Sequence, residues 1–213
     1  MKKLLLLLLM FGIYQAGFSQ YDPKALEILE EMSAKYNELS GFKAEFTYTL
    51  HNPQENINES FDGEVTVKGE KFRLKMGGQE IYNNGSTVWT YLPEVNEVNI
   101  DNYYPDAGDM TPSKIYSAYR EGYKYLFLEE QQQEGNTFEI VDLVPEDPAN
   151  QFFKIRLKID KDLDALKGWE IFDKSGNRYN YNVTSFDPTA SLGDNYFEFD
   201  PSQHKGVEVI DLR

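Results

Sequence analysis

Cysteine is absent from this chain of 213 residues, and histidine occurs only twice. Without a thiol, a cysteine nucleophile and a disulfide framework are both excluded. His51 and His204 lie in no catalytic context, because the chain contains neither G-x-S-x-G nor H-E-x-x-H. A glycine-rich phosphate-binding loop is missing as well. We therefore predict a protein that is not an enzyme, with no catalytic residue and no cofactor.

A metal site has equally little support. Asp160, Asp162 and Asp164 have the spacing of the first ligands in a calcium-binding loop. Ala165, however, stands where such a loop needs glycine, and Ile171 stands where it needs a bidentate glutamate. We therefore predict an exposed polar turn between two strands and no metal site.

Basic residues are scarce relative to acidic ones. The chain has 21 Lys and Arg against 36 Asp and Glu, for a net charge of −15. Removing Lys2 and Lys3 with a leader would leave 19 basic residues against 36 acidic ones, or −17. Such acidity argues against binding to nucleic acid or to anionic lipid head groups, and it favours a monomer that stays off membrane surfaces.

Long apolar runs are absent except at the beginning of the chain. Two lysines follow the first methionine, residues 4–13 are mostly leucine and other apolar types, and small residues lie within 17–19 before Gln20. This pattern is typical of a secretory signal peptide and is too short for a spanning helix. We expect a signal peptide at residues 1–19 and one domain at 20–213. Since no cysteine follows the cleavage site, the mature protein should be soluble in the periplasm without a lipid anchor.

Alternation of apolar and polar residues dominates the rest of the chain and predicts antiparallel strands with one buried face. In residues 42–51, apolar side chains alternate with Lys, Glu, Thr and His. Further strands are expected at residues 61–67, 72–76, 95–100, 138–144, 153–159, 169–171, 179–183, 194–200 and 207–212. Residues 123–128 are apolar but ambiguous between helix and strand. The aromatic content of 15% agrees with a mainly β domain.

Two helices are expected beside these strands. Asp22-Pro23 combines an N-cap with proline at the first helical position, and apolar residues then recur at helical spacing as far as Gly41. Thr111-Pro112 repeats the signal and predicts a short helix carrying Ile115, Tyr116 and Tyr119.

The segment NGSTVWTYLP, residues 84–93, departs from the alternation. Asn84-Gly85 predicts a tight hairpin turn. The strand that follows is apolar or aromatic on both faces, with Trp89 and Tyr91 on one face and Val88, Thr90 and Leu92 on the other. Both faces must then be covered, either by ordinary packing of a central strand or, on one face, by an apolar ligand.

Three segments resemble the LolA family, the periplasmic carriers of outer-membrane lipoproteins. They are LSGFKAEFTYT after the first helix, EIYNNGSTVWTYLPEVNEV in the middle, and FEFDPSQHKGVEVIDLR at the end. The resemblance covers nearly the whole chain after the leader. It implies an unclosed antiparallel β-barrel with a lid of short α-helices over a hydrophobic cavity.

The resemblance also implies a function. Such a carrier accepts an acylated lipoprotein from an inner-membrane ABC exporter, shields its acyl chains across the periplasm and passes it to an outer-membrane acceptor. The family's better-studied members carry an arginine in the turn after the second strand, which is linked to closing the lid. Here Lys68 and Lys71 occupy that turn and could serve as the lid latch, although lysine lacks the fork geometry of arginine.

The predicted cavity lining combines inward positions of several strands with the second helix. It comprises Phe46, Tyr48, Phe72, Leu74, Met76, Trp89, Tyr91, Ile115 and Tyr119. Two other functions stay open at this point. One is a related half-barrel that binds or senses lipid in the cell envelope, and the other is a secreted hydrolase on the same scaffold.

Overall fold

A computed structural model describes residues 21–104, 111–190 and 192–213. The described residues form one α-helix, three short 3-10 helices and twelve strands. In chain order the elements are α1 (Pro23–Glu38), β1 (Phe42–Asn52), β2 (Ile57–Lys68), β3 (Lys71–Met76), β4 (Gln79–Asn83), β5 (Thr87–Leu92), β6 (Glu97–Asn102), η1 (Ala118–Arg120), β7 (Tyr123–Gln133), β8 (Asn136–Pro145), β9 (Phe152–Asp160), β10 (Ala165–Asp173), β11 (Arg178–Asp187), η2 (Asp194–Phe197), η3 (Pro201–Gln203) and β12 (Glu208–Asp211). The expected signal peptide lies outside the described residues.

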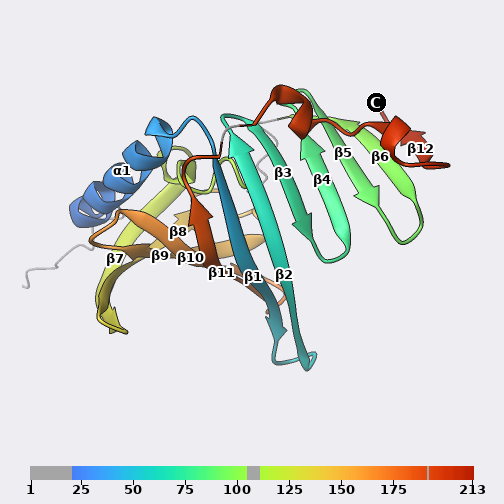
Figure 1. Cartoon of the computed structure of the whole chain (residues 1–213). Helices are drawn as coiled ribbons and strands as arrows, with labels where there is room; N and C mark the ends of the chain where they lie inside the picture. Colours follow the sequence, from blue (N-terminus) through green and yellow to red (C-terminus); the bar gives the residue numbers. More distant parts are fainter. Residues whose placement is uncertain (1–20, 105–110, 191) are drawn as a thin grey trace, which may run out of the picture.

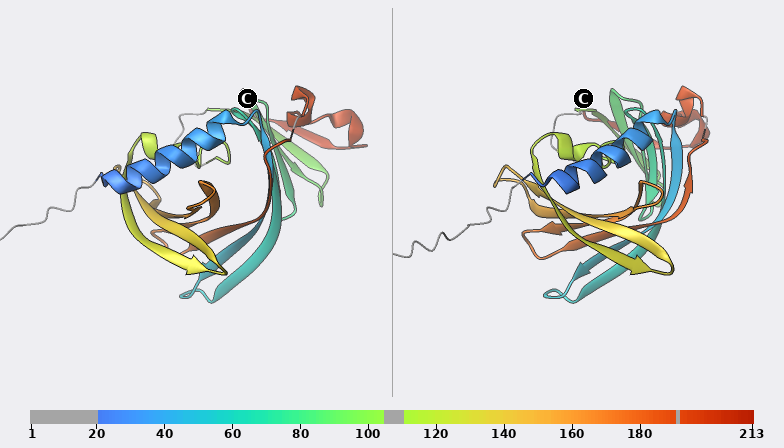
Figure 2. Two further views of the ribbon diagram at one scale, coloured as in Figure 1. Left: turned by 60° about the vertical axis from the view of Figure 1, so that its left-hand side comes forward. Right: turned by 90° about the vertical axis from the view of Figure 1, so that its left-hand side faces the viewer.

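All twelve strands belong to one open sheet. Their order is β12-β6-β5-β4-β3-β2-β1-β11-β10-β9-β8-β7, so β7 and β12 are the two edges and the barrel does not close. Strands β7 to β11 with β1 and β2 curl around an interior, whereas β3 to β6 and β12 extend beyond it as a wing (Figure 1, Figure 2). The predicted unclosed, mainly β fold is confirmed.

The sheet departs from a pure antiparallel meander at its end. β12 pairs in parallel with β6, with Glu208 opposite Glu97. After β11, the chain crosses the sheet to its far edge. The last strand therefore runs parallel to β6, whereas a hairpin connection would have made it antiparallel. Residues 194–200, expected as a strand, instead form η2 and extended chain that pairs with no strand among the described residues.

The helix α1 lies across the open side of the curled strands (Figure 2). Asp22 caps it, with a side-chain oxygen accepting the backbone N–H of Lys24 at 2.9 Å, and Pro23 occupies its first turn. Its buried stripe faces the interior and consists of Ala25, Ile28, Leu29, Met32, Ser33 and Tyr36. Among the described residues, no helix has the length and apolar character needed to cross a membrane.

The second expected helix is absent from the described structure. Residues 111–117 form consecutive turns that lead into η1, and their backbone bonds span three residues, as from Lys114 N–H to the Thr111 carbonyl at 2.9 Å. Ser and Tyr are weak helix formers, and Gly122 ends the segment with a positive φ of 76°. Ile115, Tyr116 and Tyr119 are nevertheless buried against the interior. The lid therefore consists of one helix and a turn segment, where several short helices were expected.

Each face of the sheet carries its own apolar cluster. The inner cluster joins α1 and residues 115–119 to the inward side chains of β1, β2, β3 and β8 to β10. The outer cluster consists of Tyr82, Tyr91, Val98 and Phe199, with Trp89 and Val207 packed against it. Consecutive residues of β4 divide between them, since Ile81 packs with the inner cluster and Tyr82 belongs to the outer one.

The outer cluster is covered by residues 192–207, which we call the strap. The strap runs along the wing (Figure 1). Phe199 lies 5.1 Å from the ring of Tyr91 and 5.6 Å from that of Tyr82, measured between centroids. His204 stacks on Phe199 at 4.5 Å. This packing explains one face of residues 88–92, since Trp89 and Tyr91 meet the protein's own chain there.

Candidate functional site

An apolar cavity of about 100 Å³ lies on the inner face beneath the turn segment. It is lined by Phe46, Val65, Leu74, Met76, Thr111, Pro112, Ile115, Trp169, Ile171 and Tyr181. None of the described residues that line it is charged, and among them Thr111 and Tyr181 supply the side-chain hydroxyls. Such a wall suits an apolar ligand and offers nothing that could hold a metal or activate a nucleophile.

Two local arrangements shape this cavity. Gly63 on β2 stands opposite Phe46 on β1, and a Cβ added at Gly63 would lie 2.4 Å from the Phe46 ring. Glycine is therefore required for the ring to lie flat across β2 and form part of the wall. On the other side, Trp169 stacks on Tyr181 with centroids 4.6 Å apart and planes within 10°. This stack joins β10 to β11 and fixes the direction of both rings.

The helix is attached firmly to one side of the barrel. At its N-terminal end, Asp22 accepts the Phe127 N–H at 3.2 Å. Near its C-terminal end, the buried hydroxyl of Tyr36 accepts the Leu166 N–H at 3.2 Å, and burial raises the pKa of Tyr36 to about 12. The Lys35 ammonium donates to the carbonyl of Leu163. These bonds hold α1 to β7 and to the β9–β10 turn.

The turn segment 111–117 is held differently. Its hydrogen bonds among the described residues stay within the segment and the adjoining η1, such as those from Ser117 and Ala118 to the Lys114 carbonyl, and η1 reaches α1 where Arg120 donates to Ser33 at 3.3 Å. Ile115 and Tyr116 attach it by packing, and Tyr116 stacks on Tyr36 at 5.0 Å. Since apolar contacts are non-directional, this segment can shift with less loss of bonding than α1.

Four of the sequence-predicted lining residues meet in the cavity wall: Phe46, Leu74, Met76 and Ile115. Phe72 and Tyr119 lie deeper, in the buried part of the inner cluster, and Tyr48 packs against its edge. Trp89 and Tyr91 are corrected, because they lie with the outer cluster on the opposite face of the sheet. They were predicted to line the cavity because their strand is rich in aromatic residues. The register of β3, β4 and β5 instead places Trp89 opposite Tyr82, on the face that the strap covers.

Sequence reasoning missed Val65, Trp169, Ile171 and Tyr181 as lining residues. Residues 169–171 and 179–183 were expected as strands, but none of their side chains was assigned to the cavity. The missing information was that β11 pairs with β1, which brings Tyr181 opposite Tyr48. No local signal reports a pairing between strands so far apart in the chain.

Lys68 and Lys71 hold the strap. Both ammonium groups pair with the carboxylate of Asp194, at 2.9 and 3.2 Å, and Lys68 also donates to the Leu192 carbonyl at 3.1 Å. Hydrogen bonds from the two lysines keep the pKa of Asp194 below its usual range. Among the described residues, no ion pair or hydrogen bond joins either lysine to α1 or to 111–117. The structure thus connects the expected latch to the strap instead of the lid.

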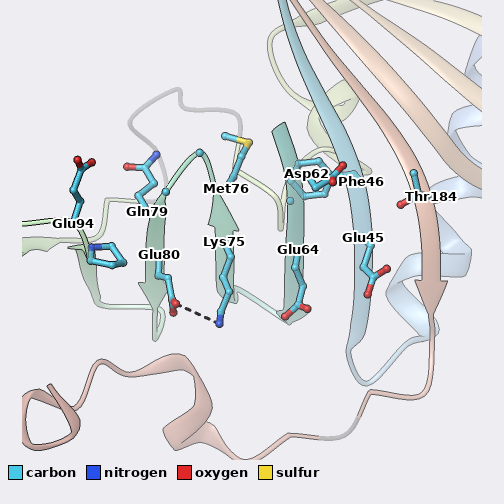
Figure 3. Close-up of a pocket in the computed structure, with 14 residues that line it drawn as sticks. Glu45, Phe46, Asp62, Glu64, Lys75, Met76, Gln79, Glu80, Glu94 and Thr184 are labelled. Carbon is cyan, nitrogen blue, oxygen red and sulfur yellow. Dashed lines mark ion pairs between the residues drawn. The ribbon is translucent and has the colours of Figure 1, made fainter. Parts of the chain in front are cut away.

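A second, open hollow of about 790 Å³ lies near the β3–β4 turn. Glu45, Glu64, Lys75 and Glu80 stand side by side across β1 to β4 on one side of the sheet (Figure 3). Lys75 pairs with Glu80 at 3.3 Å, and Lys43 pairs with Glu64 at 2.7 Å. Phe46 and Met76 also border this hollow, so its wall combines charged side chains with two residues that line the inner cavity.

The aspartates at 160–164 form a turn. Asp160 accepts the backbone N–H groups of Asp162 and Leu163, each at 3.2 Å, and Asp164 has a φ of 47°. The Asp160 oxygen is therefore used in capping the β9–β10 connection. Over the residues that the structure describes, no three His, Asp or Glu side chains are grouped as metal ligands.

Comparison with known proteins gives a consistent result. The family described as outer membrane lipoprotein carrier protein LolA matches residues 37–200. An outer-membrane lipoprotein carrier protein from Photobacterium profundum is 24% identical over 188 residues, covering 86% of this chain and 89% of that protein.

Comparison with solved structures supports the fold through one protein of similar overall arrangement. An uncharacterized conserved protein from Thermus thermophilus superposes with a TM-score of 0.58 at 16% identity, covering 88% of this chain and 99% of that one. A LolA superfamily protein from Nitrosomonas europaea aligns with a TM-score of 0.46 at 14% identity, covering 83% of this chain and 98% of its own.

Proposed function

The chain belongs to the LolA family of outer membrane lipoprotein carrier proteins, and we propose that it carries lipoproteins from the inner to the outer membrane with their acyl chains in the inner-face cavity. The observation that supports this most directly is the uncharged cavity beneath the turn segment. Burial of each methylene contributes about 0.8 kcal/mol, so acyl chains cannot cross an aqueous compartment uncovered at low cost.

The cavity must enlarge to do this work. Its volume of about 100 Å³ is below the roughly 150 Å³ that holds a single benzene in an engineered protein core. In this proposal the structure is the unloaded state, and loading displaces residues 111–117 from the Phe46 and Leu74 side of the wall. The helix remains attached through Asp22 and Tyr36.

The partners follow from the same proposal. An inner-membrane ABC exporter supplies the lipoprotein, and an outer-membrane acceptor receives it. The chain has no nucleotide-binding motif of its own, so the exporter provides the energy for loading. Without residues 1–19, 19 basic residues against 36 acidic ones leave a net charge of −17, which keeps a monomeric shuttle away from anionic membrane surfaces between the two partners.

Location in the periplasm depends on the leader. We propose that residues 1–19 are removed and that the working protein begins at Gln20, as a soluble chain without a lipid anchor. N-terminal sequencing of the protein from a periplasmic extract tests this. An acylated N-terminus, or recovery only with membranes, would overturn it.

The central experiment is purification from periplasm followed by mass spectrometry of the bound material. We expect di- or triacylated lipoproteins, and added carrier should release such lipoproteins from spheroplasts. Free lipid without lipoprotein would favour a lipid-binding envelope protein instead. No bound lipid and no release of lipoprotein would refute the carrier function.

A further inference from the structure

A row of aromatic side chains leads from the cavity wall to the exposed Phe61 on β2. Strand register places Phe61 of β2 opposite Tyr48 of β1, Tyr48 opposite Tyr181 of β11, and Tyr181 opposite Trp169 of β10. Trp169 is opposite Leu157 of β9. All five side chains lie on the inner face, because directly paired residues share a face.

Exposure changes steadily along this row. Leu157 is 0% exposed, Trp169, Tyr181 and Tyr48 are half-buried, and Phe61 is 41% exposed. Neighbouring rings touch along the row, with centroid distances of 4.6 Å for Trp169–Tyr181, 5.1 Å for Tyr48–Tyr181 and 6.3 Å for Tyr48–Phe61. The row is thus a continuous apolar surface that begins in the cavity wall and ends in water.

The hydroxyls of Tyr48 and Tyr181 have no hydrogen-bond partner within the described part of the chain. Burial raises the pKa of both, so each keeps its proton and can donate. Tyr179, next to them on β11, differs, since its hydroxyl donates to Asp173 at 3.0 Å. Two uncommitted donors on touching rings, at the border between an apolar wall and solvent, are suited to an acceptor that enters with an apolar ligand.

From this placement we infer that the hydroxyls of Tyr48 and Tyr181 donate hydrogen bonds to the ester carbonyls of the acylglyceryl group on the cargo. This inference rests on the proposed function. The chemistry matches, because an ester carbonyl accepts hydrogen bonds, carries no charge and sits where an acyl chain joins its polar head. The acyl chains then extend toward Trp169 and Leu157, and the glyceryl-cysteine and the protein attached to it leave past Phe61.

The arrangement also gives specificity for linkage. An ester-linked ligand satisfies both donors, whereas an ether-linked ligand of equal length brings no carbonyl. A ligand that shields one of these hydroxyls from water without pairing it should bind about fivefold more weakly, from a net hydrogen-bond value near 1 kcal/mol. Apolar contact alone would not distinguish the two ligands.

The test compares two synthetic probes, a peptide with an ester-linked dipalmitoylglyceryl cysteine and its ether-linked dialkyl analogue. Dissociation constants are measured for the wild type and for the double variant Tyr48→Phe, Tyr181→Phe, by competition with a fluorescent fatty-acyl probe. The wild type should bind the ester probe about 25-fold more tightly than the ether probe, and the variant should bind both at the weaker value. Each single variant should lose about fivefold toward the ester probe.

The control is Tyr196→Phe, which removes a hydroxyl from the strap on the outer face and should change neither constant. Equal binding of both probes by the wild type, or an equal loss of both in the double variant, overturns the inference while leaving the carrier function intact. Binding of neither probe by the wild type refutes the carrier function and the inference together.

Discussion

The two faces of the sheet bury similar side chains but differ in what covers them. On the outer face, Phe199 and Phe197 of the strap are 5% and 0% exposed, and the cluster is sealed by the protein's own chain. On the inner face, a cavity remains beneath residues 111–117. The outer cluster is therefore covered by the protein's own chain, beside an open polar hollow of about 410 Å³ that Tyr82 and the strap line, whereas the inner face keeps an apolar cavity.

The polar groups show the same difference. In the outer cluster, Tyr82 donates to Glu80 at 2.7 Å and Tyr91 donates to Asn96 at 3.2 Å. In the inner wall, Tyr181 and its neighbour Tyr48 have no such partner among the described residues. The two tyrosines of the outer cluster are thus paired within the protein, although Thr66 Oγ1 and Arg73 Nε on the same face are buried without a partner among the described residues.

The largest effect should come from placing a carboxylate on each face. Leu74→Glu puts a charge in the cavity wall, where a shift of the turn segment lets water reach it, so we expect a folded protein that has lost at least about 100-fold in acyl-probe affinity. Val98→Glu buries the same charge in the sealed cluster, at a site 0% exposed, and should abolish folding. Burying an unpaired charge costs several kcal/mol, which is a large part of a total free energy of unfolding of about 5–15 kcal/mol.

Thermal unfolding and probe binding measure both variants. Unfolding of Leu74→Glu would mean that the inner face is an ordinary core. A folded Leu74→Glu that still released lipoproteins from spheroplasts would remove the cavity from the mechanism.

A smaller effect should follow from truncating the strap. Phe199→Ala removes a ring that contacts Tyr82, Tyr91 and His204, and should lower the free energy of unfolding by about 3–5 kcal/mol. Leu74→Ala should cost less, about 2 kcal/mol, because its side chain already borders empty space. Urea titration measures the free energy of unfolding of both variants. Equal losses would contradict the inference that the outer face is packed more completely than the inner face.

The smallest effect should come from Asp194→Asn, which breaks the ion pairs with Lys68 and Lys71. The folded-state pKa of Asp194 is lowered, so its carboxylate stabilises the fold at pH values above the unfolded pKa of about 3.9. This stabilisation disappears as the pH falls through the folded-state pKa. Exposure to solvent keeps it small. Melting temperatures of the variant and the wild type should differ slightly at neutral pH and converge once the pH falls below the lowered folded-state pKa of Asp194. A loss of acyl binding in this variant would instead support the original hypothesis that Lys68 and Lys71 hold the lid closed.

Much of the fold was accessible from local patterns. The hairpin turns at Gly69 and Gly85 have positive φ, at 57° and 92°, as their sequences predict, and alternation located most strands. The turn segment 111–117 was mistaken for a helix because Thr111 and Pro112 are typical of a helix start. Packing of its tyrosines against the inner cluster determines the backbone conformation instead. β4 was missed because QEIYN is short and mixed in character.

The site was predictable only in part, for a physical reason. Inward side chains of a single strand follow from period two, which correctly grouped Leu74 and Met76. Which face of a strand is inward depends on the strands that pair with it. Trp89 and Tyr91 were assigned to the wrong face because the local sequence does not show whether a ligand or the strap covers their side chains. The pairing of β1 with β11 likewise lies beyond any local pattern.

The strap has a consequence for the order in which the molecule can be completed. Glu208 pairs with Glu97 across a long stretch of chain, and closing so large a loop is slow and entropically costly. Because a polypeptide is synthesised and exported from its N-terminus, β4, β5 and β6 emerge with Tyr82, Trp89 and Tyr91 still uncovered. In an exported chain, this aromatic surface would stay open to aggregation until residues 197–211 had crossed the membrane, so that completion of translocation becomes the event that permits final folding.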